Sequence, residues 1–274
     1  MKHALLALLV VLSVCAPAPA SRDILLATTT STQDSGLLDI LIPDFEARTG
    51  YRVKTLAVGT GQALAIGQRG DADVLLVHAP AAELEFMATG AGDRRLLVMH
   101  NDFILVGPPD DSAGVRGMTV FQAFRRIAAA GASFLSRADR SGTDLLEKSL
   151  WQQTEIAPQR PWYIEAGVGM GQTLTIASEK RAYTLSDRGT FLARRDPLQL
   201  AILVEKDPPL INLYHVITVN PRRFPRVNRA GADAFADYLV SPRAQERIGA
   251  FGTERFGQPL FFPDAGKCDE DVVP

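Results

Sequence analysis

Apolar positions along the chain fall into short continuous runs that alternate with stretches of helical spacing. The run from Asp23 to Ala27 is typical of a buried strand, and apolar residues from Leu37 to Phe45 recur at helical spacing until Thr49-Gly50. Further strands are predicted at 51–58, 73–77, 96–107, 132–135, 162–165, 181–185, 200–204 and 210–220. Further helices are predicted from 61 onward and at 121–130, 143–151, 173–179, 230–239 and 242–251. This alternation predicts an α/β fold with a mixed, mostly parallel sheet covered on both faces.

The second half of the chain repeats two short signatures of the first half. A hydroxyl-rich turn ends in Ser35-Gly36, and a similar turn ends in Ser141-Gly142, each ahead of a helical segment. A Gly-x-Gly-Gln-x-Leu turn then begins at Gly59 and again at Gly169. The repetition predicts two lobes that offer similar backbone turns to one ligand held between them.

A linker rich in proline and aspartate at 108–112 separates the two halves. The helices of the C-terminal tail are expected to return to the first lobe, so the chain crosses between the lobes twice and forms a hinge. The predicted division is a signal peptide at 1–20, lobe 1 at 21–106, lobe 2 at 107–207, and a return to lobe 1 at 208–274.

The first twenty residues read as an export signal. A positive start precedes a short apolar run at 5–14, and the alternating Ala-Pro stretch ends in the small-x-small pattern of a cleavage site at Ala20. The apolar run is shorter than the ~20 residues that cross a bilayer. Lipidation at Cys15 is the less favoured alternative, because Val14 stands where such signals place a small residue. A periplasmic location is therefore predicted.

Composition excludes some classes of function. Apolar residues make up 46% of the 274-residue chain, enough for a substantial core, and the formal net charge is −2. Because arginines are dispersed and no basic cluster alternates with aromatic residues, nucleic-acid binding is not expected. Catalysis is not expected either, since the sequence lacks a nucleophile elbow, a phosphate loop and histidines at metal-binding spacing. His78 and His100 are expected to be structural hydrogen-bonding residues.

The repeated turns favour an oxyanion as ligand. Helix N-termini carry unpaired N–H groups and a partial positive charge, nearby Ser and Thr add hydroxyl donors, and Gly permits close approach. Ser35 and Ser141 could equally serve only as caps of their own helices. Arg137 could form a bidentate contact with an oxyanion, or a surface ion pair with Asp139 or Asp144. Arg140 is the second candidate in this turn.

Several longer segments resemble one family closely. They are Thr28 to Leu38, Ala57 to Leu64, Gly70 to Pro80, Val98 to Phe103, Ser136 to Thr143, Tyr183 to Gly189 and Asn212 to Pro221. Together they resemble the tungstate-binding solute-binding proteins of ABC importers over almost the whole chain after residue 20. The resemblance implies a type II periplasmic-binding fold, in which two α/β lobes joined by a two-crossing hinge close on one oxyanion.

The resemblance also implies the binding residues and partners. The anion would be held by Thr28, Thr29, Thr60 and Gly61 of lobe 1 and by Arg137, Ser141, Thr143 and Gly171 of lobe 2. Arg137 matches an arginine associated in this family with tungstate selectivity, whereas Ala138 stands where relatives commonly have Gly. The implied partners are a permease and its ATPase, with a monomeric protein, no cofactor, and tungsten bound only as its oxyanion. Molybdate, sulfate and phosphate are alternative ligands, and an oxyanion-sensing domain or a small-molecule enzyme are alternatives of other classes.

Overall fold

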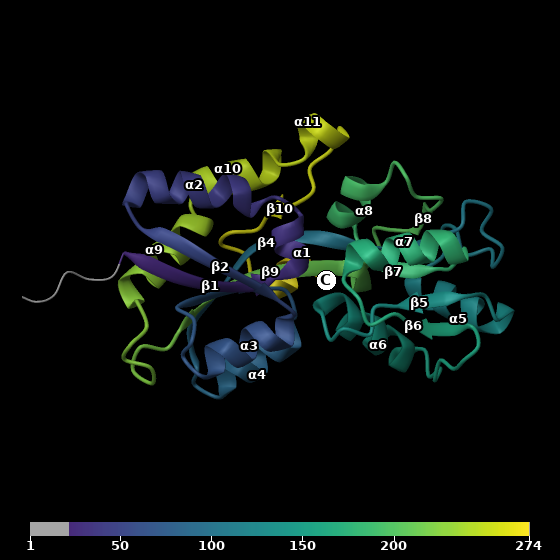
Figure 1. The fold of residues 1–274 in the computed structure, drawn as a ribbon, viewed down its shortest axis with the longest axis horizontal. Helices are drawn as coiled ribbons and strands as arrows, with labels where there is room; N and C mark the ends of the chain where they lie inside the picture. Colours follow the sequence, from purple (N-terminus) through teal and green to yellow (C-terminus); the bar gives the residue numbers. More distant parts are fainter. Residues whose placement is uncertain (1–21, 274) are drawn as a thin grey trace, which may run out of the picture.

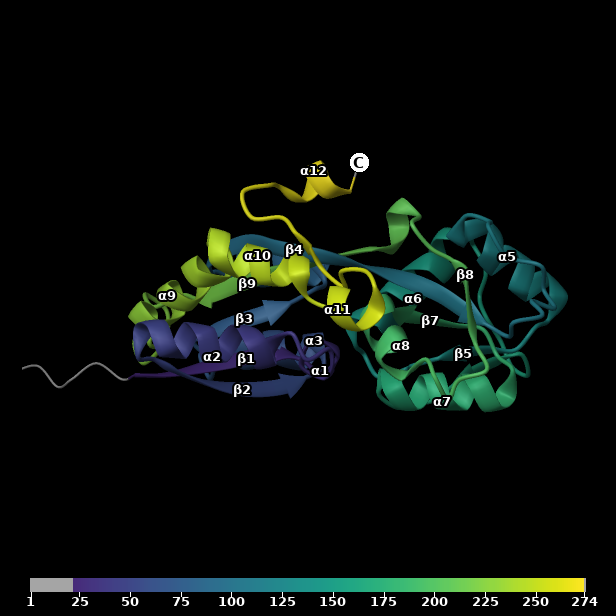
Figure 2. The same cartoon turned by 90° about the horizontal axis from the view of Figure 1, so that it is seen from above.

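The computed structural model describes residues 22–273, so the predicted signal peptide at 1–20 and Cys15 lie outside the described residues. Two α/β lobes lie side by side and are joined by extended strands (Figures 1 and 2). Lobe 1 holds the N-terminal and C-terminal segments of the chain, and lobe 2 holds the middle. Within the described residues, no helix has the length and apolar character needed to cross a membrane.

Lobe 1 is built on a sheet with the strand order β10-β4-β9-β3-β1-β2. Its strands are β1 (Asp23–Thr29), β2 (Arg52–Val58), β3 (Val74–Val77), β4 (Gly92–Gly107), β9 (Ile211–Val219) and β10 (Phe262–Pro263). In lobe 2, β7 (Thr184–Asp187) and β8 (Ala201–Val204) pair with β4, while β5 (Phe134–Ser136) pairs with β6 (Tyr163–Glu165). An isolated bridge between Phe134 and Tyr183 joins these two groups of strands.

The sheet is mixed, but the expectation that it is mostly parallel was wrong. Among the described residues, parallel pairing is limited to β1–β2, β1–β3, β5–β6 and the isolated bridge between Phe134 and Tyr183. Every pair that includes β4 or β9 is antiparallel. The reason is that β4 and β9 carry the chain between the lobes as extended strands that run in opposite directions, without the crossover helix that parallel neighbours require.

The strand β4 belongs to both lobes. Its residues from Gly92 to Asp102 pair with β9, and those from Phe103 to Gly107 pair with β7 and β8. The chain returns through a short 3-10 turn, Pro208–Leu210, that leads directly into β9. The two crossings therefore lie next to each other, at the point where Asn101 and Asn212 are register partners.

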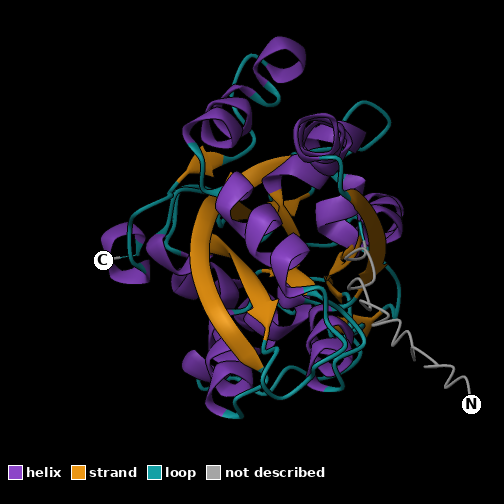
Figure 3. Cartoon of the chain, turned by 90° about the vertical axis from the view of Figure 1, so that its left-hand side faces the viewer, coloured by secondary structure: helices purple, strands orange, loops and turns teal. Residues whose placement is uncertain are grey.

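Helices pack on both sides of the strands in each lobe (Figure 1), and they surround the sheet of lobe 1, which faces the viewer in Figure 3. The helices of lobe 1 are α1 (Thr30–Asp34), α2 (Leu38–Thr49), α3 (Thr60–Gln68), α4 (Pro80–Ala88), α9 (Arg229–Leu239), α10 (Pro242–Ala250), α11 (Thr253–Phe256) and α12 (Asp269–Val272). Those of lobe 2 are α5 (Val120–Ala130), α6 (Gly142–Gln153), α7 (Met170–Lys180) and α8 (Arg188–Arg194). Each lobe accordingly has two apolar clusters, around Phe45 and Leu75 in lobe 1 and around Phe124 and Leu174 in lobe 2. These clusters hold the ends of the strands in place at the boundary between the lobes.

Candidate oxyanion-binding site

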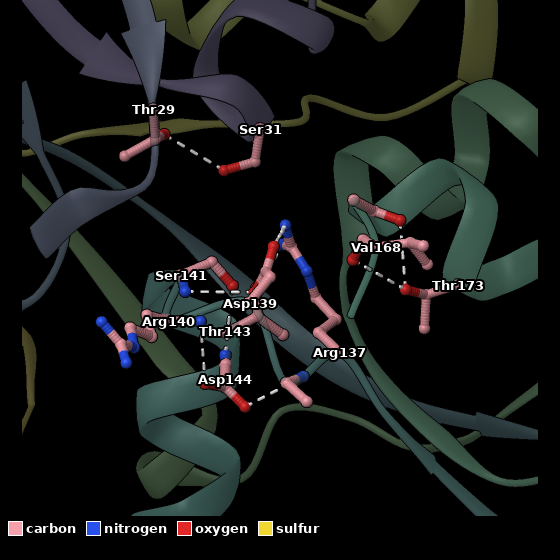
Figure 4. A network of polar contacts seen from close by, with 12 residues as sticks. Thr29, Ser31, Arg137, Asp139, Arg140, Ser141, Thr143, Asp144, Val168 and Thr173 are labelled. Atoms are coloured by element: carbon pink, nitrogen blue, oxygen red, sulfur yellow. Dashed lines mark hydrogen bonds and ion pairs between the residues drawn. The ribbon is translucent and has the colours of Figure 1, made fainter. Parts of the chain in front are cut away.

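In lobe 1, a buried group of hydroxyls forms where β1 ends. Thr29 caps α1 by accepting a hydrogen bond from the Thr32 N–H at 3.2 Å. Its hydroxyl also lies 2.6 Å from the Thr32 hydroxyl and 3.1 Å from that of Ser31. The Thr28 hydroxyl, in contrast, donates to the Leu76 carbonyl at 2.7 Å, so this side chain is used within the sheet. Thr29 and Ser31 are the hydroxyl residues of this turn that face lobe 2 (Figure 4).

His78 lies beside these hydroxyls, directly after β3. Its Nε2 atom is 3.1 Å from the Thr29 hydroxyl and 3.2 Å from the Ser31 hydroxyl, and its Nδ1 atom is 3.0 Å from Oδ1 of Asn212. Burial lowers the pKa of His78 to about 4, and the positive charge of Arg137 adds to the shift. The ring is therefore neutral at pH 7.

A second turn of lobe 1 precedes α3. Gly59 is the N-cap residue in extended conformation, and Thr60 is the first helical residue. Thr60 is fully buried, and its hydroxyl has no hydrogen-bond partner among residues 22–273. A Cβ atom at Gly61 would meet nothing within 4 Å. This turn thus holds a buried hydroxyl without a protein partner at the N-terminus of α3.

In lobe 2, Arg137 follows β5 and lies almost entirely buried, with 2% of its surface exposed. Its guanidinium points toward Ser31 (Figure 4). One Nη atom donates to the Thr143 hydroxyl at 3.3 Å, and the other forms an ion pair with Asp139. The Nε–H has no partner within the described part of the chain. A buried guanidinium with an unpaired donor is expected to have a further acceptor when the site is filled.

The turn that carries Arg137 is held by Asp144. Its carboxylate accepts hydrogen bonds from the N–H groups of Ala138 at 3.1 Å and Arg140 at 3.0 Å. Ser141 caps α6 by accepting from the Asp144 N–H at 3.3 Å. Both Ala138 and Arg140 have positive φ, 50° and 60°. The Arg140 side chain is exposed and points away from Arg137 (Figure 4), so of the two arginines only Arg137 faces lobe 1.

The turn before α7 lies against Arg137. The Gly167 N–H donates to the Arg137 carbonyl at 2.8 Å, and Gly169 is the N-cap residue of α7. Gly171 sits in the first turn of this helix, beneath the Arg194 side chain from α8. A Cβ at Gly171 would come within 2.5 Å of Arg194 Nε. Because Arg194 is exposed, its guanidinium would have to move to make room for a larger residue at this position.

The two halves of the site meet directly. A Cβ atom at Gly142, the first residue of α6, would lie 2.8 Å from the His78 ring. A Cβ at Gly59 would lie within 4 Å of the carbonyls of Asp139 and Arg140. The N-terminal turns of α3 and α6 therefore face each other across the boundary between the lobes, with the Arg137 guanidinium between them and the hydroxyls of α1.

Comparisons with known proteins identify the family of this chain. A family profile described as a PBP superfamily domain matches residues 16–243. A tungstate-binding protein TupA of Peptoclostridium acidaminophilum is 49% identical over 251 residues, which cover 90% of this chain and 88% of the relative. This chain belongs to the TupA family within the PBP superfamily.

Two solved structures of the TupA family share the fold. The tungstate-binding protein TupA from Desulfovibrio alaskensis G20 is 46% identical with a TM-score of 0.79, covering 89% of this chain and 99% of that chain. A structure described as the tungstate ABC transporter from Geobacter sulfurreducens is 44% identical with a TM-score of 0.77, covering 84% and 98%. The expected two-lobed periplasmic-binding fold is thereby confirmed.

For this TupA-family chain, the two Ser-Gly signatures are not equivalent. Ser141-Gly142 begins α6, as the repeat predicts. Ser35 instead ends α1, where its hydroxyl donates to the Thr32 carbonyl at 2.7 Å, and Gly36 has a φ of 82°. The residue that corresponds to Ser141 as a helix cap is Thr29. The Gly-x-Gly-Gln-x-Leu turn, in contrast, is equivalent in both copies, because Gly59 and Gly169 cap α3 and α7 with the same extended backbone.

Sequence reasoning missed two residues of this site. Ser31 lies within the segment from Thr28 to Leu38 but was not among the predicted contacts, although it is buried and faces Arg137. His78 was expected to be a structural hydrogen-bonding residue, which its contacts confirm, but nothing in its local pattern indicates contact with a turn 47 residues earlier. Within residues 22–273, no group of three or more His, Cys, Asp or Glu residues gathers as a metal site would.

Proposed function

We propose that the protein is the periplasmic solute-binding component of an ABC importer and captures tungstate between its two lobes. It works as a monomer and delivers the anion to a permease driven by an ATPase. The TupA relatives, which are described as tungstate-binding, support the ligand, and the relative described as a tungstate ABC transporter supports the transport partner. The eight residues named above remain the proposed contacts, with Ser31 added and with Thr28 contributing through its backbone.

The observation that carries this proposal is the buried Arg137. Its guanidinium is 2% exposed, its Nε–H is unpaired in the described structure, and it points toward the hydroxyls of the opposite lobe. Charge-assisted hydrogen bonds to an anion contribute about 1.5–3 kcal/mol each. Nanomolar affinity corresponds to about −12 kcal/mol. Donors from both lobes are needed to reach that value, so binding favours the state in which the lobes are together.

The carboxylates near the site determine whether a protonated anion finds an acceptor there. Asp139 uses one oxygen for Arg137 and the other for the Ser141 N–H. Asp144 is 1% exposed and accepts from Ala138, Arg140 and Lys148. Each engaged oxygen of Asp139 nevertheless keeps a second lone pair, and the buried Asp187, which interacts with the charge of Arg137, has an Oδ1 atom without a hydrogen-bond partner among residues 22–273. Phosphate is therefore an alternative ligand beside molybdate and sulfate.

Calorimetric titration of the mature protein with tungstate, molybdate, sulfate and phosphate tests the proposal. We expect tungstate to bind most tightly of the four anions. Arg137→Ala should weaken tungstate binding by about 10- to 100-fold, because a charge-assisted hydrogen bond is lost. The exposed Arg125→Ala serves as a matched control in lobe 2 and should bind like the unmodified protein. Tighter binding of another anion, or equal affinities for the two variants, would contradict the assignment.

A further inference from the structure

His78 stands at a junction between the proposed anion site and the hinge. On one side, its Nε2 atom contacts the Thr29 and Ser31 hydroxyls at 3.1 and 3.2 Å. On the other side, its Nδ1 atom contacts Oδ1 of Asn212 at 3.0 Å. The side chain is 4% exposed, and its ring stacks on Tyr214 with centroids 4.6 Å apart. One ring therefore links two polar groups that would otherwise be separate.

The partners of Asn212 determine where the imidazole carries its proton. The Asn212 amide nitrogen donates to Asn101 Oδ1 at 2.7 Å and to the Tyr214 hydroxyl at 3.1 Å. With both N–H groups used, the Asn212 amide presents its oxygen to His78, and an oxygen there requires a proton on Nδ1. In a neutral ring, Nε2 then lacks a proton and accepts hydrogen bonds from hydroxyls.

The same residues occupy the two hinge crossings. Asn101 lies on β4 and Asn212 on β9, and they are register partners where these strands pass between the lobes. On the far side of the boundary, Gly142 of lobe 2 packs against the His78 ring and its carbonyl. A change in the angle between the lobes therefore alters contacts on both sides of the imidazole.

We infer that His78 is a positioning residue of the oxyanion site. Its Nε2 atom accepts a hydrogen bond from the Thr29 hydroxyl and thereby orients the hydroxyls of that turn for the anion. The Thr29 hydroxyl oxygen already accepts a hydrogen bond from the Thr32 N–H and contacts the Thr32 hydroxyl. Donation of its own O–H group to His78 therefore completes the hydrogen bonding of Thr29. The proton of Ser31 is then available to an anion, which is a stronger acceptor than a neighbouring hydroxyl. This inference rests on the proposed function.

Two amide variants separate this role from a merely structural one. In His78→Gln, the longer side chain can place an acceptor oxygen where Nε2 stands, whereas in His78→Asn the amide reaches only the Nδ1 position and keeps the contact with Asn212. If His78 orients the hydroxyls, the Gln variant retains tungstate affinity within about threefold, and the Asn variant loses at least about tenfold. The partly exposed His100→Gln, outside the site, is the matched control.

Titration calorimetry with sodium tungstate measures the affinities, and thermal unfolding identifies any variant that does not fold. Nitrogen-15 NMR of the unmodified protein reads the ring directly, and we expect a protonated Nδ1 and an unprotonated Nε2 at pH 7. A proton on Nε2, or an Asn variant that binds as tightly as the Gln variant, would overturn the inference. If instead the unmodified protein bound none of the four anions, the proposed function itself would fail.

Discussion

At the scale of single residues, Ala138 shows how the backbone presents Arg137. Its φ of 50° lies in the left-handed region, which costs an L-residue with a side chain roughly 1–2 kcal/mol. Two hydrogen bonds to the buried Asp144 carboxylate hold the turn in this shape. The methyl group does not exclude the left-handed turn that a Gly would form, so the departure from the family pattern leaves the direction of Arg137 intact.

Glu147 is a second residue whose environment has a measurable consequence. It lies on α6 with 2% exposure, and one of its oxygens accepts from Trp151 Nε1 at 3.0 Å and from the Tyr163 hydroxyl at 2.7 Å. Burial raises the pKa of Glu147 to about 7, from about 4.5 in an unfolded chain. A raised carboxyl pKa means that folding favours the protonated form. The contribution of Glu147 to the free energy of unfolding is therefore complete below pH 4.5 and is lost as the pH rises through 7.

Glu147→Gln should remove this dependence on pH. A Gln side chain keeps the acceptor oxygen and cannot ionise, so the variant avoids a penalty that reaches about 3 kcal/mol in the unmodified protein above pH 8. Chemical denaturation at pH 5 and pH 8 measures the free energy of unfolding of the variant and of the unmodified protein. The stability of the variant relative to the unmodified protein should be greater at pH 8 than at pH 5. For Glu179→Gln, at an exposed position of α7, this difference should not depend on pH. If the stability difference between Glu147→Gln and the unmodified protein were the same at both pH values, Glu147 would not ionise between pH 5 and pH 8.

At the scale of elements, strands and long helices could be predicted because their apolar spacing is local. The strand at Asp23–Thr29 and the helix at Leu38–Thr49 were predicted nearly to their ends. The helices Thr30–Asp34 and Arg188–Arg194 were missed, because each is a short turn begun by a side-chain cap rather than by an apolar stripe. Pro80–Ala88 was also missed, although Pro80 at its start is a common signal.

The two Ser-Gly pairs provide an element-scale prediction. Gly36 has a φ of 82°, and a Cβ there would contact only distant side-chain atoms at 3.8 Å or more. Gly36→Ala should therefore lower stability by roughly 1–2 kcal/mol through backbone strain and leave anion affinity nearly unchanged. Gly142 has helical backbone in α6, but a Cβ would lie 2.8 Å from the His78 ring. Gly142→Ala should leave the separate lobes folded and weaken tungstate binding, because the lobes cannot approach fully.

Denaturant unfolding and calorimetry on the same two variants distinguish these effects. Stability should fall for the Gly36 variant, and affinity for the Gly142 variant. If both variants lost affinity equally, the Ser-Gly pairs would be functionally equivalent after all, and the structural difference between them would have no bearing on binding.

At the scale of the molecule, the lobes and the class of ligand could be predicted, but the contacts between the lobes could not. The repeated turns indicated two similar halves, and those turns before α3 and α7 have the same geometry. The link from His78 to Asn212 spans 134 residues, and the approach of Gly142 to His78 depends on how the lobes sit together. Such pairs follow from the hinge formed by β4 and β9, which leaves no local pattern in the sequence.

This division of the site between two lobes predicts how the whole molecule responds to its ligand. Donors from lobe 1 and lobe 2 reach one anion only when the lobes are together, so tungstate should shift the population toward that state. At one hundred times its dissociation constant, a ligand adds about 2.7 kcal/mol to the free energy of unfolding, which corresponds to a rise in Tm of roughly 5–10 °C for a chain of this size. Small-angle X-ray scattering should show a smaller radius of gyration with tungstate than with sodium chloride at equal ionic strength. A rise in Tm without any change in radius would mean that the anion binds to lobes that are already together, and the hinge would then have no part in capture.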